Sequence, residues 1–285
     1  MTQHSSCPRR SYVAEAFRLA WPADYKGARL IVALTAYLDA SWTSSAVTVA
    51  GYVSDVDRWA SFETEWQDVL TGYGIEYFHM KDFAAREGDY KSWGPKGDCR
   101  LVRLLEIINA SVLAAVSITV PLGLWRAVLS DEERERSGNP YCIAGFGCFR
   151  EIARWMRREC GAGDEVAYVY DQGDKGRGEI FKLFNAVYDS QDLRREYRLL
   201  SMKVEDKKRF VPLQAADILA WERNREVPKG LGLDAMPSKC SMPIGGWMDT
   251  FLATLDIDGS AEWYRRSLNQ FQEPSDPKVE CCRRD

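Results

Sequence analysis

Two apolar runs along this chain of 285 residues each end in an aspartate. Residues 30–38 form the first run, which Asp39 closes, and residues 166–170 form the second, which Asp171 closes. Short apolar runs rich in β-branched and aromatic residues are typical of buried strands. A third acid, Asp217, lies in a stretch that is rich in Leu and Ala and too long for another strand. That stretch predicts a helix.

The segments between these acids alternate between strand and helix patterns. A strand-like run at 46–53 follows the Asp39 strand closely enough to predict a β-hairpin. The apolar residues from Trp59 to Leu70 have helical spacing and predict a helix with one buried face. Beyond them we expect a short strand at 75–79, a long loop at 80–97, helices at 99–110, 141–158 and 179–188, and strands at 112–120 and 198–203. This succession predicts an α/β fold.

Composition divides the chain into four parts. We expect an N-terminal arm at 1–27, an α/β domain at 28–226, a C-terminal helical extension at 227–272 and a disordered tail at 273–285. The two amphipathic helices of the extension are expected to pack on the core, with a homo-oligomer as the alternative. No stretch approaches the roughly 20 consecutive apolar residues that cross a bilayer, so we expect a cytoplasmic protein without membrane contact.

The small number of histidines limits the kinds of metal site that this chain can form. The chain has only two histidines, which excludes three-histidine zinc sites and the HExxH helix. Its eight cysteines form no CxxC pair, so reduced thiols are expected. Neither a Walker A loop nor a nucleophile elbow is present. Oxygen ligands are therefore the groups that remain.

The aspartates would meet if the Asp39 and Asp171 strands were parallel neighbours, because α/β folds bind ligands at the carboxyl ends of their strands. Like charges a few ångströms apart need a proton or a cation between them. Carboxylate oxygens favour Mg²⁺ or Mn²⁺. With Asp217 from a helix across the sheet edge, the site could hold two metals about 4 Å apart. These ligands predict phosphodiester hydrolysis with a metal-bound water as the nucleophile.

Four polar side chains near these acids are candidates for contacts to the substrate. Lys175 and Arg177 belong to the glycine-rich loop after the second strand and could meet phosphates. Lys203, at the end of the following strand, is a further candidate for a phosphate contact. Gln214 shares a helix face with Asp217. A surface position is the alternative for Lys203, and a solvent-facing helix face is the alternative for Gln214.

Each aspartate also has a simpler interpretation when it is taken alone. Asp39 could open a turn, Asp171 could cap the glycine-rich turn, and Asp217 could face water. The net charge of −4 argues against indiscriminate binding to nucleic acid, although local basic patches occur. The hypothesis of a metal site therefore depends on the three acids converging.

Four short segments strengthen that hypothesis. They read Tyr-Leu-Asp-Ala-Ser at 37–41, Tyr-Phe-His-Met-Lys-Asp-Phe at 77–83, Tyr-Asp-Gln-Gly-Asp at 170–174 and Pro-Leu-Gln-Ala-Ala-Asp at 212–217. Together they resemble domain-of-unknown-function family 3800 over residues 28–225. The resemblance implies a ribonuclease H-like mixed central sheet flanked by helices. In that superfold, acids on the first strand, the fourth strand and a late helix hold two divalent metals, and Asp39, Asp171 and Asp217 match them in order.

One position departs from the family pattern. The chain has Ala40 where the family usually has glutamate, so Asp174, Glu63 or Asp82 would have to substitute if that glutamate is a ligand. His79 and Asp82 lie in a matched segment and are candidate accessory residues, as is Asp174. A purely structural role of His79 in its loop is the alternative.

The leading hypothesis is a metal-dependent nuclease with nucleic acid as its partner. One alternative is a catalytically reduced module of the same fold that binds nucleic acid or a protein. A second alternative is a phosphatase or nucleotide hydrolase that acts on small substrates.

Overall fold

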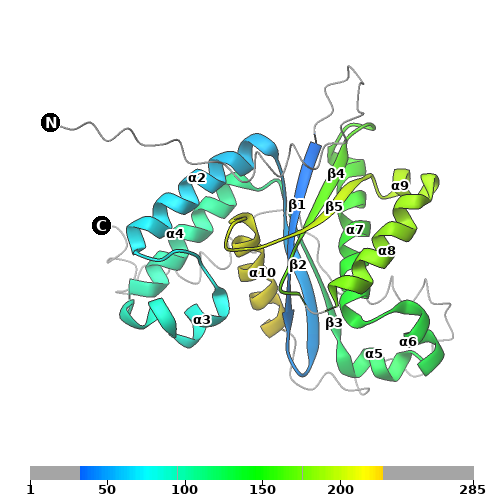
Figure 1. The fold of residues 1–285 in the computed structure, drawn as a ribbon, viewed down its shortest axis with the longest axis horizontal. Helices are drawn as coiled ribbons and strands as arrows, with labels where there is room; N and C mark the ends of the chain where they lie inside the picture. Colours follow the sequence, from blue (N-terminus) through cyan, green and yellow to red (C-terminus); the bar gives the residue numbers. More distant parts are fainter. Residues whose placement is uncertain (1–32, 95, 175, 227–285) are drawn as a thin grey trace.

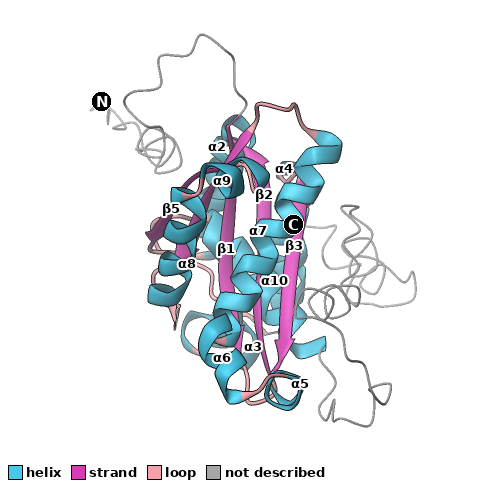
Figure 2. Ribbon diagram, turned by 90° about the vertical axis from the view of Figure 1, so that its right-hand side faces the viewer, coloured by secondary structure: helices cyan, strands magenta, loops and turns pink. Residues whose placement is uncertain are grey.

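A five-stranded mixed sheet with helices on both faces is the framework of the molecule (Figure 1). The computed structural model describes residues 33–94, 96–174 and 176–226. The strands are β1 (Ala33–Trp42), β2 (Ala46–Asp55), β3 (Ala114–Pro121), β4 (Glu165–Asp171) and β5 (Leu199–Glu205), in the order β3-β2-β1-β4-β5. β2 is antiparallel to β1 and β3, whereas β4 is parallel to both β1 and β5. A view turned by 90° shows the strands side by side (Figure 2).

Helices form a layer on each side of this sheet (Figure 1). One layer contains α2 (Val56–Tyr73), α3 (Met80–Ala85), the 3-10 helix η1 (Gly88–Ser92), α4 (Lys96–Ser111) and α10 (Pro212–Glu226). The other contains α5 (Leu122–Val128), α6 (Asp131–Ser137), α7 (Pro140–Glu159), α8 (Arg177–Asp189) and α9 (Gln191–Glu196). α10 packs directly on β1 and β2, and α7 packs on β2 and β3. Within the described residues no helix is long and apolar enough to cross a membrane.

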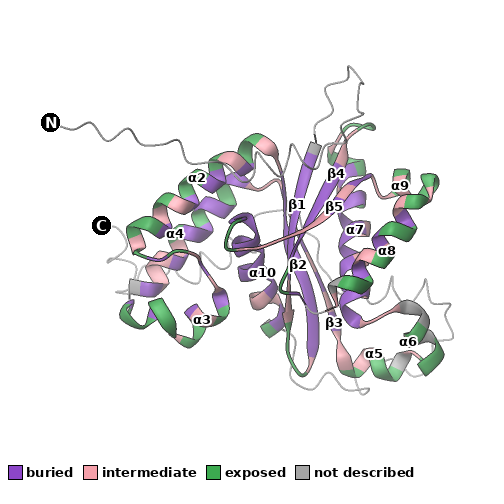
Figure 3. Ribbon diagram, in the orientation of Figure 1, coloured by how far each residue is buried: buried purple, intermediate pink, exposed green. Residues whose placement is uncertain are grey.

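Side-chain alternation along the strands sends the acids to one face of the sheet. Leu38 belongs to the apolar core between the sheet and α7, whereas Tyr37 belongs to the core under α2 and α10. Asp39 comes two residues after Tyr37 and therefore points to the α10 side. In β4 the same alternation places Asp171 on the side of Val169, which also belongs to the α10 core. The central strands β2 and β4 and most of β1 are buried, whereas β3 and β5 are partly exposed (Figure 3).

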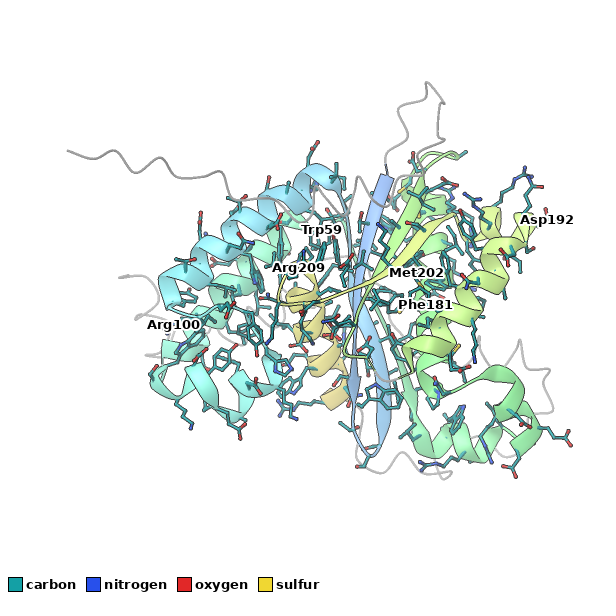
Figure 4. All side chains as sticks on the ribbon, in the orientation of Figure 1. Trp59, Arg100, Phe181, Asp192, Met202 and Arg209 are labelled. Atoms are coloured by element: carbon teal, nitrogen blue, oxygen red, sulfur yellow. The ribbon has the colours of Figure 1, made fainter. Side chains whose placement is uncertain are left out.

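The predicted arrangement of the strands is confirmed. The first two strands form an antiparallel hairpin, and the strands that carry the two aspartates are parallel neighbours, with Leu38 beside Tyr170. The aromatic stripe of α2 is buried, with Trp59 facing the sheet (Figure 4). On the opposite face, Met202 of β5 belongs to the second core cluster, and Phe181 of α8 packs against that cluster (Figure 4). The expected α/β arrangement is thus present as a mixed sheet between two helical layers.

The short strand expected at 75–79 is wrong. The backbone N–H of Phe78 donates to the side chain of Gln214, and that of His79 donates to the hydroxyl of Tyr90. Because side chains satisfy these backbone groups, the segment needs no partner strand. The loop expected at 80–97 also contains α3 and η1, since Met80 and Phe83 insert into the core at helical spacing.

Several expectations fall on residues that the structure does not describe. These are the N-terminal arm, the C-terminal extension with its helices, and the tail. Among the described cysteines, Cys142, Cys148 and Cys160 are free thiols, as expected. Cys99, in α4, is disulfide-bonded, so the expectation of reduced thiols is wrong at that position. Cysteine spacing alone does not reveal such a pairing.

Candidate metal centre

Four aspartates converge at the edge of the sheet where β1 and β4 end. Carboxylate oxygens of Asp39, Asp171 and Asp174 all lie within 4.8 Å of one another, and the three side chains are buried. Asp217 reaches the same place from α10 and is also buried. The alternative that Asp217 faces water is therefore wrong, because the polar face of α10 is buried.

A tight turn after β4 brings Asp174 back against Asp171. The N–H of Asp174 donates to the carbonyl of Asp171 at 3.3 Å, and the N–H of Gly173 donates to the Asp171 carboxylate at 3.3 Å. Tyr141 on α7 donates its hydroxyl to Asp174 Oδ2 at 2.9 Å. Asp171 therefore both caps this turn and faces the other acids. Asp174, which the sequence offers as a substitute for a ligand at position 40, thus lies beside Asp39 and Asp171.

Lys207 lies among the carboxylates and comes from the loop between β5 and α10. Its ammonium Nζ is 2.8 Å from Asp39 Oδ2, 3.3 Å from Asp217 Oδ1 and 3.5 Å from Asp171 Oδ2. In the sequence Lys207 belongs to a local basic patch with Lys203, Lys208 and Arg209, for which a solvated face is the simpler expectation. No signal in a single sequence separates Lys207 from the neighbouring Lys208, whose ammonium lies over the ring of Tyr77.

The electrostatics of the cluster follow from burial and crowding. Burial, and then the neighbouring Asp174, raise the pKa of Asp39 well above its usual range, although Lys207 opposes the shift. Burial and the charge of Asp171 raise the pKa of Asp174 to about 7. Burial lowers the pKa of Lys207, but the charges of Asp39, Asp217 and Asp171 outweigh this effect, so the pKa is raised above its usual value. One ammonium thus leaves these acids short of positive charge.

Asp217 is held from two sides. The N–H of Met80, at the start of α3, donates to Asp217 Oδ2 at 2.7 Å, and Lys207 contacts Oδ1. His79 Nε2 lies 3.9 Å from the same Oδ1, while its Nδ1 is 2.8 Å from Asp82 Oδ2. Asp82 therefore orients the imidazole of His79 toward the acids. Asp217 was expected as the third metal ligand, but its oxygens lie outside the set that Asp174 completes.

A cleft of about 480 Å³ opens onto these groups. Its floor contains the four aspartates and Lys207. Its walls contain the side chains of Trp42, Lys81, Trp221 and Arg225, together with His79. Trp42 is 39% exposed, and the guanidinium of Arg225 lies 4.3 Å from the centre of the Trp221 ring. Aromatic rings and cations thus surround an acidic floor.

Of the four residues predicted to contact the substrate, the two whose side chains the structure describes do not line the cleft. Lys175 lies outside the described residues, and Arg177 is the first residue of α8. Lys203 pairs with Val169 in the register of β4 and β5 and is not part of the cleft lining. Gln214 is fully buried and also absent from that lining.

Gln214 instead joins three segments of the protein. Its Oε1 accepts from Trp66 Nε1 at 2.9 Å and from the N–H of Phe78 at 2.8 Å. Its Nε2 donates to the carbonyl of Lys207 at 2.8 Å. Because its amide is buried and bonded to these partners, Gln214 does not contact a ligand in the cleft. Gln214 therefore attaches three segments to α10, namely α2, the segment before α3 and the loop that contains Lys207.

The donors that converge here fit a hard divalent cation. Asp39, Asp171 and Asp174 offer only carboxylate oxygens, which Mg²⁺ and Mn²⁺ prefer. Crowding of buried carboxylates is relieved by a bound proton or by an added cation. A comparison with models of protein families, with curated proteins and with solved structures found no match. A proposal for the function must therefore start from the chemistry of these carboxylates.

Proposed function

We propose that this protein is a divalent-metal-dependent hydrolase of phosphodiester bonds, with nucleic acid as its substrate. The observation that carries the proposal is the set of buried carboxylates from Asp39, Asp171 and Asp174 at the carboxyl edge of parallel strands. Ligands in α/β folds bind at this edge. Mg²⁺ or Mn²⁺ held there would activate a water molecule and offset negative charge on the phosphate.

The arrangement of the acids supports a ribonuclease H-like fold for the domain. Asp39 lies on the first strand, Asp171 on the fourth and Asp217 on the last described helix. This is the order that the resemblance to domain-of-unknown-function family 3800 implies. Asp174 takes the place of a ligand from position 40, where this chain has alanine.

The reaction requires two proton movements. Water oxygen forms a bond to phosphorus, the ester P–O bond breaks, one proton leaves the water and one joins the leaving oxygen. His79 lines the cleft, and its ring is oriented by Asp82, so it is placed to exchange a proton there. Lys207 supplies a fixed positive charge beside the acids.

The cleft walls favour a polynucleotide over a small phosphate ester. Trp42 and Trp221 contribute aromatic side chains to the lining, and stacking of bases on aromatic side chains tolerates any base sequence. Lys81 and Arg225 bring positive charge to the same walls, where a phosphate backbone would pass. The aromatic and the cationic side chains therefore both line the cleft around its acidic floor.

The test is a cleavage assay on the full chain with Mg²⁺ or Mn²⁺. Its substrates are labelled single- and double-stranded DNA and RNA, with a nucleoside triphosphate and an aryl phosphate as small substrates. We expect cleavage of a polynucleotide that EDTA abolishes and that Asp39→Asn and Asp171→Asn remove. Hydrolysis of the small substrates alone would point to a phosphatase or nucleotide hydrolase instead.

A catalytically reduced binding module is the second candidate. It is favoured by Lys207, which already neutralises part of the acidic cluster without any ion. Calorimetric titration separates the two functions. A module of this kind would bind labelled nucleic acid but would take up neither Mg²⁺ nor Mn²⁺ at millimolar concentrations.

A further inference from the structure

Lys207 lies where a cation would contact the carboxylates on α10 and β1 together. Its Nζ is within 3.5 Å of oxygens from Asp39, Asp171 and Asp217. Its side chain is only 19% exposed, whereas most lysines extend into water. The ammonium is thus part of the floor of the cleft.

The backbone of Lys207 is fixed as firmly as its side chain. Its N–H donates to Asp171 Oδ1 at 3.3 Å, and its carbonyl accepts from Gln214 Nε2 at 2.8 Å. The N–H groups of Arg209 and Phe210 both donate to the carbonyl of Asp206 at 2.9 Å, which closes the loop into a turn. The ammonium is therefore preorganised by the fold.

The oxygens of Asp217 are already engaged by protein donors. Oδ2 accepts from Met80 N–H, and Oδ1 faces Lys207 with His79 nearby. A divalent ion needs its oxygen ligands at about 2.0–2.2 Å, and it cannot share one position with an ammonium. Asp39 and Asp171 also accept from protein N–H groups, those of Ala40, Gly173 and Lys207. Within the described residues, however, the oxygens of Asp39, Asp171 and Asp174 converge within 4.8 Å of one another, which favours these three acids as the ligands of an ion.

We propose that this centre takes one divalent ion, at Asp39, Asp171 and Asp174, and that the Lys207 ammonium replaces a second ion. The inference rests on the proposed function and deepens it. A lysine supplies positive charge without a dissociation step, so one ion suffices for a site whose acids would otherwise attract two. Asp217 then positions the lysine and is not a ligand.

Isothermal titration of the full chain with Mn²⁺ alone tests the stoichiometry. We expect the wild type to bind one ion and Lys207→Met to bind a second one, since the variant leaves Asp39 and Asp217 without their cation. Lys208→Met is the matched control, because its ammonium lies over Tyr77 outside the cleft. It should bind one ion with the affinity of the wild type.

A wild-type crystal soaked in Mn²⁺ gives a second readout that needs no variant. We expect one anomalous peak between Asp39, Asp171 and Asp174, with Lys207 Nζ still in contact with Asp39 and Asp217. A peak between Asp39 and Asp217, with the lysine displaced, would overturn the inference. This holds even where Lys207→Met fails to fold.

The two hypotheses fail in different ways. Two ions in the wild type, or one unchanged ion in Lys207→Met, contradict the role of the lysine and leave the hydrolase proposal intact. A wild type that binds no Mn²⁺ at millimolar concentrations contradicts the proposed function and the inference together. One bound ion without cleavage of any substrate contradicts only the proposed function.

Discussion

Asp39 shows how function and stability oppose each other within one residue. Its side chain is 1% exposed, and a buried charge costs several kcal/mol unless it is paired. Its carboxylate has one ammonium partner, Lys207, which it shares with two other acids. The proposed role in ion binding therefore accounts for this residue better than any contribution to the stability of the fold.

We expect Asp39→Asn to weaken Mn²⁺ binding by at least about 100-fold, the upper range for changes around a metal centre. The amide relieves repulsion among the acids, so the unfolding free energy of the metal-free chain should stay within about 1 kcal/mol of the wild type. Titration calorimetry and urea unfolding measure the two effects. Asp192→Asn, on the exposed end of α9, is the control (Figure 4). A large loss of stability with unchanged affinity would refute this account.

Trp42 is the exposed aromatic residue of the cleft wall. Its ring stacks on Tyr141 with a centroid distance of 6.3 Å, and the residue lines the cleft. We expect Trp42→Ala to weaken binding of single-stranded nucleic acid by about 5- to 150-fold, the equivalent of one stacked base. Fluorescence anisotropy in EDTA measures this affinity without cleavage.

Leu193→Ala provides the matched control for that measurement. Leu193 is the other large apolar side chain that is exposed in the described part of the chain, and it lies on α9 away from the cleft. Its removal should leave the affinity unchanged. Equal losses in both variants would mean that Trp42 acts through general surface properties and not as a stacking platform.

Among the elements, the hairpin of β1 and β2 depends on a close approach at Gly51. A Cβ at this position would lie 1.8 Å from the carbonyl oxygen of Tyr37. Gly51 pairs with Leu38, the residue directly before Asp39. The spacing of the two strands therefore also sets the position of an acid in the cleft.

We expect Gly51→Ala to lower the unfolding free energy by about 3 kcal/mol, since the methyl group collides with backbone that cannot turn aside. Gly72→Ala in α2 is the control, because a Cβ there meets nothing within 4 Å. Removing a helical glycine should stabilise the protein by about 0.5–1 kcal/mol. Urea denaturation measures both variants. Similar effects of the two alanines would contradict the close contact.

Periodicity made most of the elements predictable from the sequence. The stripe of α2, the hairpin and the parallel strands before the two acids all follow from where apolar residues recur. The segment around Phe78 did not follow, because its backbone is satisfied by Gln214 and Tyr90. Such long-range contacts between a side chain and the backbone have no periodic signature.

The candidate site was predictable to a similar degree. Asp39 and Asp171 could be recognised because each ends an apolar run, where a charge is unexpected. Lys207 could not, since the turn around it reads as an exposed basic loop. The contributions of Asp174 and Lys207 depend on two turns folding back to the sheet edge. Tertiary structure alone brings them together.

For the molecule as a whole, a bound ion should act as a stabilising ligand. An ion that binds only the native state stabilises it by about 2.7 kcal/mol at a concentration of about 100 times its Kd. We therefore expect Mn²⁺ and Mg²⁺ to raise Tm by several degrees for the wild type and not for Asp171→Asn. Differential scanning fluorimetry measures this, with Na⁺ at equal ionic strength as the control. A rise that Na⁺ reproduces would reflect screening of surface charge.

The position of α10 in the chain has a consequence for how the protein is made. It is the last described helix, yet it lies on β1 and β2 and carries both Asp217 and Gln214. During synthesis the earlier strands leave the ribosome with their acidic edge uncovered. The lysine loop cannot be fixed until residues 212–226 have emerged. A nascent chain interrupted before that point would have the acids of β1 and β4 without Asp217 and the fixed lysine loop, so the proposed metal centre should form in one late step.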